Sequence, residues 1–588
     1  MADVAELPQG GSFLWEEAGS RKIMAPELFT DEQREFARTA REFTQKEILP
    51  RLASIEAKDP GVVPDLLRKA GELGLLMVDV PEEYGGIAAS KVTSMLVAEQ
   101  FATIGSFAVS LGAHTGIGTL PIVYYGTPEQ KARYLPDLAT GHKLAAYALT
   151  EANSGSDALA AQTRAVLSAD GTYYRLDGSK QFITNAGFAD LFTVFAKIDG
   201  ERFTAFLVER RTRGVSVGPE EHKMGIRGSS TCTLNLDDVH VPAENVLGAI
   251  GMGHKIAFNT LNIGRLKLGV ATLGGSKDAL ASATRYALDR KQFGKPIATF
   301  GLIREKLADM ALRILVNESL GYRTTGMIDE HLAHAESDDD KARAIEEFSV
   351  EASILKIYGS EALDFVADEA VQILGGYGFI EEYPVARILR DSRIFRIFEG
   401  TNEINRLIVP GTLFRRAMKG ELPLMDVTER IKSDAAAGKV PPVGGSQAEI
   451  ACGIAERAKW TTLFVTRAAI EKYLGTVAEE QEVLGVIADL MQDCFAIDSL
   501  VARNAVVREH GSDAAKEFVS AALVAFIPPV WSRVYHTARH LLMDMLDGDA
   551  LATNLEAISH LAYDLPCKVM RARRKLADAV VAAGGYPL

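Results

Sequence analysis

The chain has 588 residues, of which 47% are hydrophobic and 24% charged, and its formal net charge is −14. This composition is typical of a globular protein and excludes a mostly disordered chain, while the length predicts roughly three to five domains. The acidic balance argues against nucleic acid as a partner, because phosphate binding needs a basic surface.

The four cysteines are Cys232, Cys452, Cys494 and Cys567, and they lie far apart without a C-x-x-C pair. Neither a disulfide framework nor a metal site is predicted, and a reducing compartment fits best.

The first 19 residues carry several acids, no basic residue and no apolar core of a signal peptide. Secretory and mitochondrial targeting are therefore not predicted. The apolar run at residues 519–531 contains Pro528 and Pro529 and is too short to span a bilayer core of ~30 Å. We expect no transmembrane helix and a cytoplasmic protein.

Residues 1–27 are predicted to be an N-terminal extension, and residues 28–142 a helical domain. Thr30 precedes an amphipathic pattern and is predicted to cap its first helix. Further helices are predicted at about 64–73, 90–104, 109–124 and 127–134.

Residues 143–252 are predicted to form a small β domain, because the apolar period changes to two and Gly-containing turns separate the runs. Strands are expected at 145–150, 172–176, 191–196, 203–208 and 232–241. The first strand leads into the loop at 151–157, whose small hydroxyl residues and backbone donors can accept a phosphate or a flavin edge.

Residues 253–418 return to helical periodicity, with helices expected at 255–290, 300–329, 341–374 and after Thr401, lengths that fit a four-helix bundle. Residues 419–446 are predicted to be an irregular linker. Residues 447–588 are predicted to be a second helical domain, with helices at 447–473, 477–509, 514–546 and 553–583. The fold class is therefore mainly α with a small β domain and an additional helical C-terminal domain.

The chemical centre is predicted at Glu399, which follows an apolar run and precedes Gly400 and the helix-opening Thr401. A carboxylate in this position can act as a general base. Burial would raise its pKa, whereas the N-terminus of the next helix would lower it.

Five motifs occur in order along the chain. They are YALTE at 147–151 with GSD at 155–157, GSKQFITN at 178–185, RKQFG at 290–294, QILGGYG at 372–378, and FEGTN at 398–402. Together with the domain order, they make residues 28–415 resemble the acyl-CoA dehydrogenase family. The extra helical domain resembles the very-long-chain branch, which implies a homodimer.

The resemblance implies that Glu399 removes the α-proton of an acyl-CoA thioester and that a hydride then passes from the β-carbon to FAD. It implies FAD contacts at Tyr147, Leu149, Thr150, Gly155, Ser156, Phe182, Thr184, Arg290, Gln292, Phe293, Gln372, Gly376, Thr401 and Glu403. It implies acyl-CoA contacts at Ser156, Asn262, Arg265, Phe398, Gly400, Val109 and Ala113.

The chain departs from common family patterns at several positions. Phe182 stands where many relatives have tryptophan, Phe398 where some have tyrosine, and Glu403 where glutamine is common. Asn262 replaces a frequent aspartate, which puts a CoA contact in doubt. One branch of the family carries its catalytic base on another helix, directly before the equivalent of Arg265. In this chain that position is Gly264, so Glu399 is the only candidate for the base in the sequence.

The resemblance further implies a preference for chains of roughly twelve carbons or more, because small apolar residues at Val109 and Ala113 replace two bulky polar groups of medium-chain relatives. Gly112, Gly116 and Gly118 are expected to leave more room.

The expected electron acceptor is electron-transferring flavoprotein. The alternatives are an oxidase on the same scaffold or an assembly scaffold protein with vestigial activity. A peripheral contact of residues 419–445 with the inner membrane face is a further hypothesis.

Overall fold

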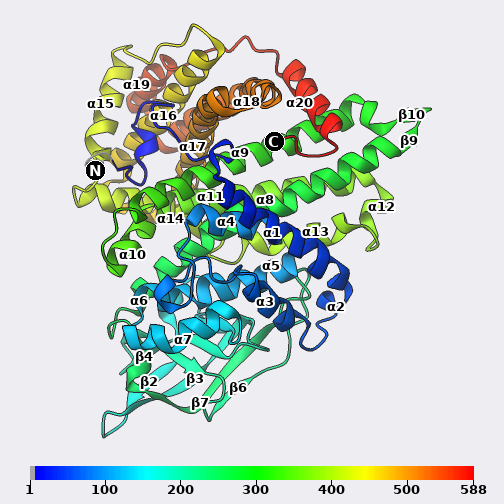
Figure 1. Ribbon diagram of the computed structural model, residues 1–588. Coiled ribbons are helices and arrows are strands. Elements are labelled where there is room, and N and C mark those ends of the chain that lie inside the picture. Colours follow the sequence, from blue (N-terminus) through cyan, green and yellow to red (C-terminus); the bar gives the residue numbers. More distant parts are fainter. Residues whose placement is uncertain (1–6) are drawn as a thin grey trace.

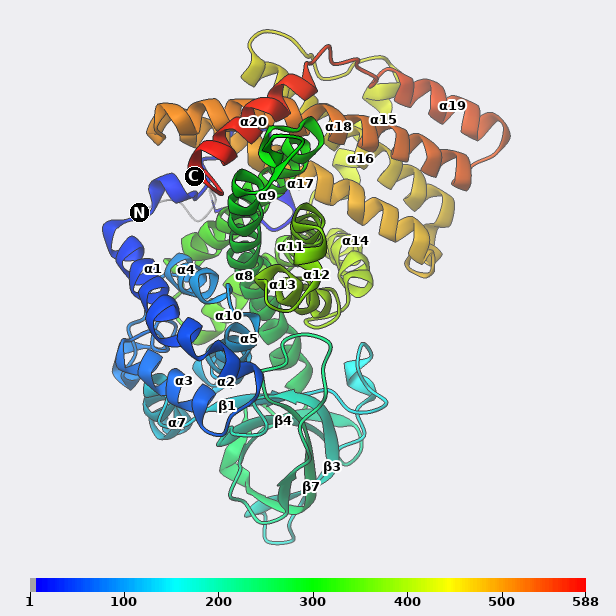
Figure 2. The ribbon, with the colours of Figure 1, turned by 90° about the vertical axis from the view of Figure 1, so that its right-hand side faces the viewer.

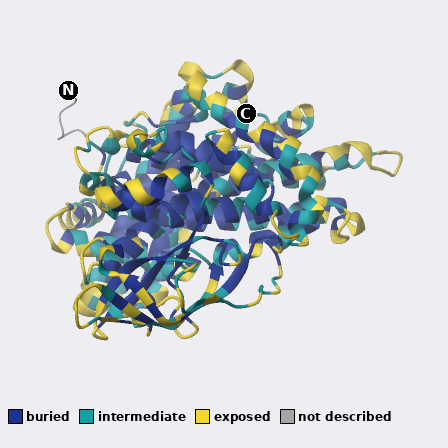
Figure 3. Cartoon of the chain, turned by 60° about the horizontal axis from the view of Figure 1, so that its bottom comes forward, coloured by how far each residue is buried: buried dark blue, intermediate teal, exposed yellow. Residues whose placement is uncertain are grey.

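The computed structural model describes residues 7–588, and its long helices form the centre of the molecule (Figure 1). The N-terminal helices pack on one side of this centre together with the β domain, and the C-terminal helices cover the opposite end (Figure 2). Buried residues concentrate in the central helices, while exposed residues lie at the periphery (Figure 3).

The N-terminal domain is helical, as predicted. Its first helix is capped by Thr30, whose side chain and that of Gln33 satisfy each other's backbone N–H groups. The helices are α1 (Asp31–Phe43), α2 (Leu52–Glu56), α3 (Val62–Glu72), α4 (Lys91–Phe101), α5 (Gly105–Gly112), α6 (Leu120–Tyr125) and α7 (Pro128–Thr140). A π-helical turn at Ala113–Gly118 joins α5 to α6 and packs against β1 and α8.

The middle domain is one sheet with the strand order β6-β7-β3-β2-β4-β5-β8, and β1 pairs in parallel with β4. The strands are β1 (Ala145–Ala148), β2 (Arg164–Leu167), β3 (Tyr173–Thr184), β4 (Leu191–Ile198), β5 (Arg202–Glu209), β6 (Val215–Val217), β7 (Thr231–Pro242) and β8 (Val246–Leu247). The sheet curls into a barrel-like shape around a small core of its own (Figure 2).

The third domain is built around the helices α8 and α11, which pack closely along each other. Its helices are α8 (Gly253–Asp289), α9 (Gly301–Leu332), α10 (Asp338–Glu347), α11 (Ser349–Leu374), α12 (Gly376–Phe379), α13 (Pro384–Ser392) and α14 (Asn402–Met418). The short hairpin of β9 (Lys291–Gln292) and β10 (Lys295–Pro296) projects from the far end of α8 (Figure 1). The single helix expected at 341–374 is divided at the buried Phe348.

The C-terminal domain contains α16 (Gln447–Tyr473), α17 (Gln481–His510), α18 (Asp513–Met545), α19 (Gly548–Ser559) and α20 (Val569–Ala583). Helix α18 continues through Pro528 and Pro529, in agreement with the single helix predicted at 514–546. The last predicted helix is two helices, because the chain between α19 and α20 is irregular.

The stretch expected to be an irregular linker contains helix α15 (Leu424–Ala436), which packs on α16 and α19. Leu422, Leu424 and Ile431 are buried in this contact. Three of the five apolar residues that suggested a membrane contact at 419–445 therefore face the protein, whereas Met425 is exposed, and the membrane contact stays a prediction.

Two helical segments, 105–125 and α18, are long and apolar enough to cross a membrane by length and composition. Length and composition therefore give two candidate transmembrane helices, whereas none was expected from the sequence. In their most apolar windows 78% and 56% of the residues are buried inside the fold, which is the burial of core helices.

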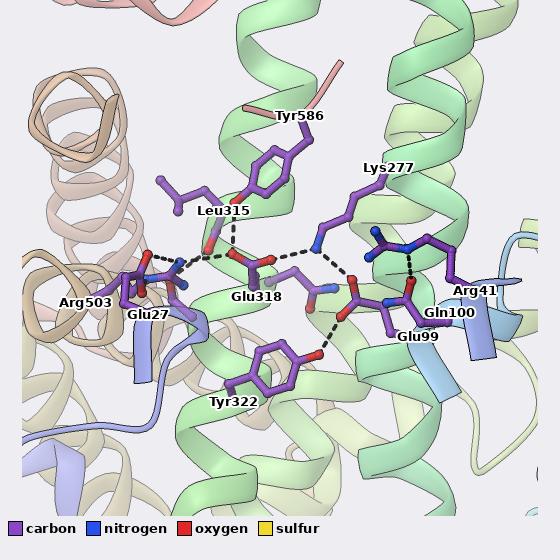
Figure 4. Close-up of polar contacts among 12 residues, drawn as sticks. Glu27, Arg41, Glu99, Gln100, Lys277, Leu315, Glu318, Tyr322, Arg503 and Tyr586 are labelled. Carbon is purple, nitrogen blue, oxygen red and sulfur yellow. Dashed lines mark hydrogen bonds and ion pairs between the residues drawn. The ribbon is translucent and has the colours of Figure 1, made fainter. Parts of the chain in front are cut away.

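A buried polar cluster ties the terminal segments to the central helices (Figure 4). Arg503 of α17 is fully buried and pairs with Glu27 of the N-terminal segment and with Glu318 of α9. Glu318 also accepts hydrogen bonds from Lys277 of α8 and from Tyr586 near the C-terminus. The additional domain is thus joined to the bundle by buried ionic contacts as well as by apolar packing.

Candidate active site

The candidate base Glu399 lies in a tight turn between the short helical turn Arg393–Arg396 and α14. The side chain of Thr401 caps α14 by accepting from the backbone N–H of Ile404. Glu399 has φ of 57° and Gly400 has φ of 78°, so two successive residues are left-handed. Such a conformation is unfavourable for glutamate and persists only where the surroundings fix it.

Side chains from two helices hold the carbonyl groups of this turn. Arg265 Nε of α8 donates to the Glu399 carbonyl at 3.2 Å, and Lys356 Nζ of α11 donates to the Gly400 carbonyl at 2.7 Å. Asn405 Nδ2 also donates to the Gly400 carbonyl at 2.8 Å. The turn is therefore fixed from α8, α11 and α14 at once.

The turn directs the Glu399 carboxylate against α8 at Gly264. Glu399 Oε2 is buried and accepts no hydrogen bond within the described chain. Burial raises the pKa of Glu399 to about 7, while the positive charges of Arg265 and Lys356 act to lower it. A carboxyl with a pKa close to neutral can both take up and release a proton at working pH.

Tyr147 of β1 approaches the same site from the β domain. Its hydroxyl donates to the Ala257 carbonyl at 3.3 Å, and burial together with the nearby Glu399 charge raises its pKa well above the usual range. The structure therefore brings together Tyr147, Arg265, Glu399 and Gly400 as the sequence predicted.

The predicted flavin contacts lie where β1 and β3 end. Residues Lys180–Ile183 of β3 form an irregularity in the sheet, at which Gln181 N–H donates to the Thr150 carbonyl at 2.8 Å. Phe182 has φ of 58° and is 61% exposed. The irregular backbone thus turns an aromatic ring outward beside Thr150, near the end of the strand at Thr184.

The adjoining loop carries Gly155 and Ser156 and is anchored by a buried ion pair. Lys180 Nζ donates to Glu151 Oε1 at 2.8 Å, and Glu151 also accepts from the backbone of Gln162 and from Thr163. Leu149 is buried, whereas Gly155 and Ser156 are exposed. The loop therefore exposes Gly155 and Ser156, while the buried ion pair holds it in position.

The second group of predicted cofactor residues lies elsewhere in the chain. Arg290, Gln292 and Gly376 line a hollow of about 520 Å³ at the far end of α8. Gln372 is exposed on α11 close to this hollow, and Phe293 is 94% exposed on the hairpin. Arg265 lies on α8, and Arg290, which directly follows the last residue of this helix, comes 25 positions later, or roughly 38 Å at 1.5 Å per residue. One chain does not bring the two groups together.

Comparison with known proteins assigns each domain. Residues 30–142, 146–239 and 251–413 match the N-terminal, middle and C-terminal domains of acyl-CoA dehydrogenases, and residues 457–560 match a further acyl-CoA dehydrogenase C-terminal domain. The chain belongs to the acyl-CoA dehydrogenase family. The predicted family, its fold and the prediction of an oxidoreductase enzyme are confirmed.

Several acyl-CoA dehydrogenases are similar to this chain. A probable acyl-CoA dehydrogenase of Bacillus subtilis is 46% identical over 99% of both chains. The very long-chain specific mitochondrial enzyme of Bos taurus is 45% identical over 58% of this chain and 51% of its own length. The crystal structure of a Bacillus anthracis acyl-CoA dehydrogenase complexed with FAD superposes with a TM-score of 0.96, at 46% identity, covering 99% of this chain and 100% of that one.

Within this acyl-CoA dehydrogenase, the residues expected to shape the acyl pocket lie at the junction of α5, the π-helical turn and α8. A Cβ added at Gly112 would meet no atom within 4 Å, and one at Gly116 would meet only Lys267 Cδ, at 3.7 Å. A Cβ at Gly118 would stand 2.7 Å from the Ala113 carbonyl oxygen. The expectation of extra room holds for Gly112 and Gly116 but is wrong for Gly118, which is closely packed.

A buried polar cluster next to this junction was not foreseen. Lys267 Nζ lies 3.5 Å from Asp79 Oδ2 and 3.3 Å from Thr115 Oγ1, and Asp79 also pairs with Lys91. The side chains of Val109 and Ala113 are apolar, as expected, but the region as a whole contains fixed charges.

Three further predicted residues have specific surroundings. Asn262 Oδ1 accepts from Arg265 Nη1 at 2.8 Å, so the asparagine orients the arginine beside the base. Phe398 packs edge-on against Phe395 with ring centroids 5.3 Å apart. Glu403 lies in the first turn of α14, where its charge suits the helix N-terminus.

The sequence analysis did not identify Lys356 or Asn405 as parts of the site. Lys356 interrupts the apolar run Ile354, Leu355 and Ile357. A lysine inside a buried helix face requires an internal partner, so this irregularity was the signal that could have revealed it.

Proposed function

We propose that the protein is an FAD-dependent dehydrogenase that introduces an α,β double bond into long-chain acyl-CoA thioesters. The observation that carries this proposal is the Glu399 carboxylate, whose Oε2 atom is buried, whose pKa is raised and which is held in a strained turn between α8 and α11. The FAD in the similar Bacillus anthracis structure supports the choice of cofactor.

The residues of this chain fit FAD in two separate places. Thr150, Thr184 and the outward-facing Phe182 offer hydroxyl groups and an aromatic surface to a flavin ring. Arg290 and Gln292 offer charged and amide donors in a hollow suited to a pyrophosphate and adenosine. FAD, when bound, supplies the hydride acceptor.

The chain itself supplies the base and a polar contact for the thioester. The Glu399 carboxylate removes the α-proton. Its backbone N–H donates no hydrogen bond within residues 7–588, so this group is available to the thioester oxygen, where negative charge develops. Gly264 leaves the space in which the carboxylate lies, and Arg265 with Lys356 fixes its turn.

Replacement of the base tests this proposal. Glu399→Gln keeps the shape of the side chain but removes the basic oxygen, so the variant is expected to bind FAD and acyl-CoA without bleaching of the flavin. The reduction rate should fall by ~10²- to 10⁴-fold. Glu421→Gln, which changes an exposed carboxylate beyond α14, is the control and should behave as wild type. Flavin reduction within about threefold of wild type in Glu399→Gln would rule out Glu399 as the base.

Transfer of electrons to electron-transferring flavoprotein is part of the proposal, and an oxidase is its alternative. A peroxide assay during turnover of acyl-CoA separates the two. Stoichiometric peroxide would identify an oxidase, whereas a dehydrogenase is expected to need an added acceptor.

We further propose a homodimer in which each subunit contributes to the FAD site of its partner. The separation of roughly 38 Å along α8 between Arg265, beside the base, and Arg290, in the second cofactor group, supports this arrangement. The exposed ring of Phe293 on the projecting hairpin would also be buried against the partner subunit. The proposal places the C-terminal domain where a second dimer docks in tetrameric relatives, so sedimentation should give a dimer, and a stable tetramer would contradict it.

A further inference from the structure

Lys356 is a buried cation directly behind the turn that carries the base. It lies in the middle of α11 and is fully buried. Its ammonium group donates to the Gly400 carbonyl and to Asn402 Oδ1, both at 2.7 Å. Burial of an ammonium group is unfavourable unless its donors are paired, so these two contacts are strongly preferred over any exposed alternative.

The two acceptors of Lys356 define the conformation of the turn. Gly400 is the second of the two left-handed residues, and Asn402 is the first residue of α14. Asn402 is itself held by a hydrogen bond to Ser360, which lies one helical turn after Lys356 on α11. Lys356 therefore connects α11 to the second strained residue of the turn and to the start of the helix that follows it.

We propose that Lys356 is a positioning residue for Glu399: it holds the strained turn through Gly400 and Asn402, and its charge favours the ionised form of the base. Only the kinetic consequences of this inference rest on the proposed function. Lys356 makes no hydrogen bond to the Glu399 carboxylate, so its influence on the base passes through the backbone and through space.

Titratable groups face Glu399 and Lys356 from the elements packed around them. Arg265 of α8 and Tyr147 of β1 interact with Glu399, whereas Glu403 of α14 and Glu361 of α11 interact with Lys356. Arg265 and Lys356 are the two cations that lower the pKa of the base against the effect of burial. Burial lowers the pKa of Lys356 to about 7, while Glu399 acts to raise it, so the two groups titrate as a coupled pair.

Three substitutions separate the two roles of Lys356. Lys356→Met removes both the hydrogen bonds and the charge, Lys356→Gln keeps a donor but removes the charge, and Lys356→Arg keeps the charge in a different shape. The readout is the acid limb of the kcat/KM profile against pH, because this limb reports the base in the free enzyme. A merely structural lysine would lower the amount of folded protein without moving this limb.

Removal of the charge should shift the acid limb of both Lys356→Met and Lys356→Gln upward by about one pH unit, since a nearby opposite charge typically changes a pKa by one unit or more. Activity on the acid side would then fall by about tenfold. The limb of Lys356→Arg should stay within about 0.3 units of wild type. Unshifted limbs in both uncharged variants would overturn the proposal, and if Lys356→Met does not fold, Lys356→Gln decides alone.

A second measurement does not depend on turnover. Difference infrared spectroscopy can follow the protonated carboxyl band that is absent from Glu399→Gln, and this band should persist to higher pH in Lys356→Gln than in wild type. Lys459→Met is the matched control, because Lys459 is also buried but bonds to Glu16 and Asp498 in another domain. A shifted infrared titration in an enzyme without acyl-CoA activity would refute the proposed function but support the role of Lys356; an unshifted one would refute that role.

Discussion

Glu399 and Gly264 are in direct contact: a Cβ atom added at Gly264 would lie 2.4 Å from Oε2 of the Glu399 carboxylate and 2.7 Å from its Cδ. Contacts below 3.0 Å are not tolerated by a real Cβ atom, so the neighbour has to move. The glycine is thus required by the base, which occupies the space of a side chain on α8.

Gly264→Ala should therefore displace the carboxylate and lower the rate of flavin reduction by at least about tenfold, because small errors in the position of a general base are costly. The fold should be retained, since alanine favours a helix. Gly411→Ala on α14 is the control, because a Cβ there would meet no atom within 4 Å. Equal stopped-flow reduction rates for the two variants would contradict the prediction.

Stability should fall as pH rises from about 4.5 to 7 through a second buried carboxyl. Burial raises the pKa of Glu351 from 4.5 to about 7, while the Gly11 N–H that it accepts at 2.6 Å acts to lower it. Over this range the unfolded chain has released a proton that the folded protein retains, so deprotonation destabilises the folded state.

Glu351→Gln removes this pH dependence. Compared with wild type, its free energy of unfolding should gain up to about 3 kcal/mol at pH 8 and little below pH 4.5. Urea denaturation at several pH values measures the difference. Glu336→Gln, at an exposed position, should follow wild type throughout. A constant difference between Glu351→Gln and wild type at all pH values would show that Glu351 does not titrate as described.

The proposed acyl-chain preference can be tested at the junction of α5 and α8. Wild type should have its highest kcat/KM at roughly twelve carbons or more, since each further buried methylene group contributes about 0.8 kcal/mol. Val109→Gln with Ala113→Glu should shift the optimum to shorter chains, and Gly112→Leu should do the same by filling open space. A wild-type optimum at about eight carbons or fewer, or an unchanged optimum in these variants, would contradict the preference.

Arg503→Met tests the buried cluster that joins the C-terminal domain to the bundle. It leaves Glu318 and Glu27 without their shared cation, and loss of one partner from a buried ion pair costs about 3–5 kcal/mol. The expected result is a large drop in the free energy of unfolding, with partial recovery when Glu318→Gln is added. Arg571→Met, at an exposed position of α20, should have almost no effect.

Much of the helical architecture could be predicted because long segments carry a continuous apolar face. The range predicted for α16, 447–473, agrees with the structure, and α8 and α9 differ by only a few residues at their ends. Strand β2 was missed because only Ala165 of its four residues is buried, so it has no alternating pattern. The helix predicted at 514–546 includes Pro528 and Pro529, and α18 continues through them because its packing on neighbouring helices outweighs the local preference of proline.

The site was predictable as far as its motifs extend. Glu399 and Tyr147 lie in two of the five motifs, Arg265 was identified through the family resemblance, and the structure brings the three together. Lys356 and Asn405 act on backbone carbonyl groups of a turn whose shape no pattern reports. The left-handed conformation of Glu399 is likewise a property of the folded surroundings, since glutamate has no local preference for it.

The pairing of Glu27 with Arg503 joins residues 476 positions apart in the sequence. During synthesis at about 5–20 residues per second, the N-terminal segment must therefore wait for tens of seconds before its partner leaves the ribosome. Phe13 and Leu14, which are buried in the finished protein, have no completed binding surface during that interval. Among the first residues to be made, this segment is among the last to reach its place, so its apolar side chains remain without their final partners while translation continues.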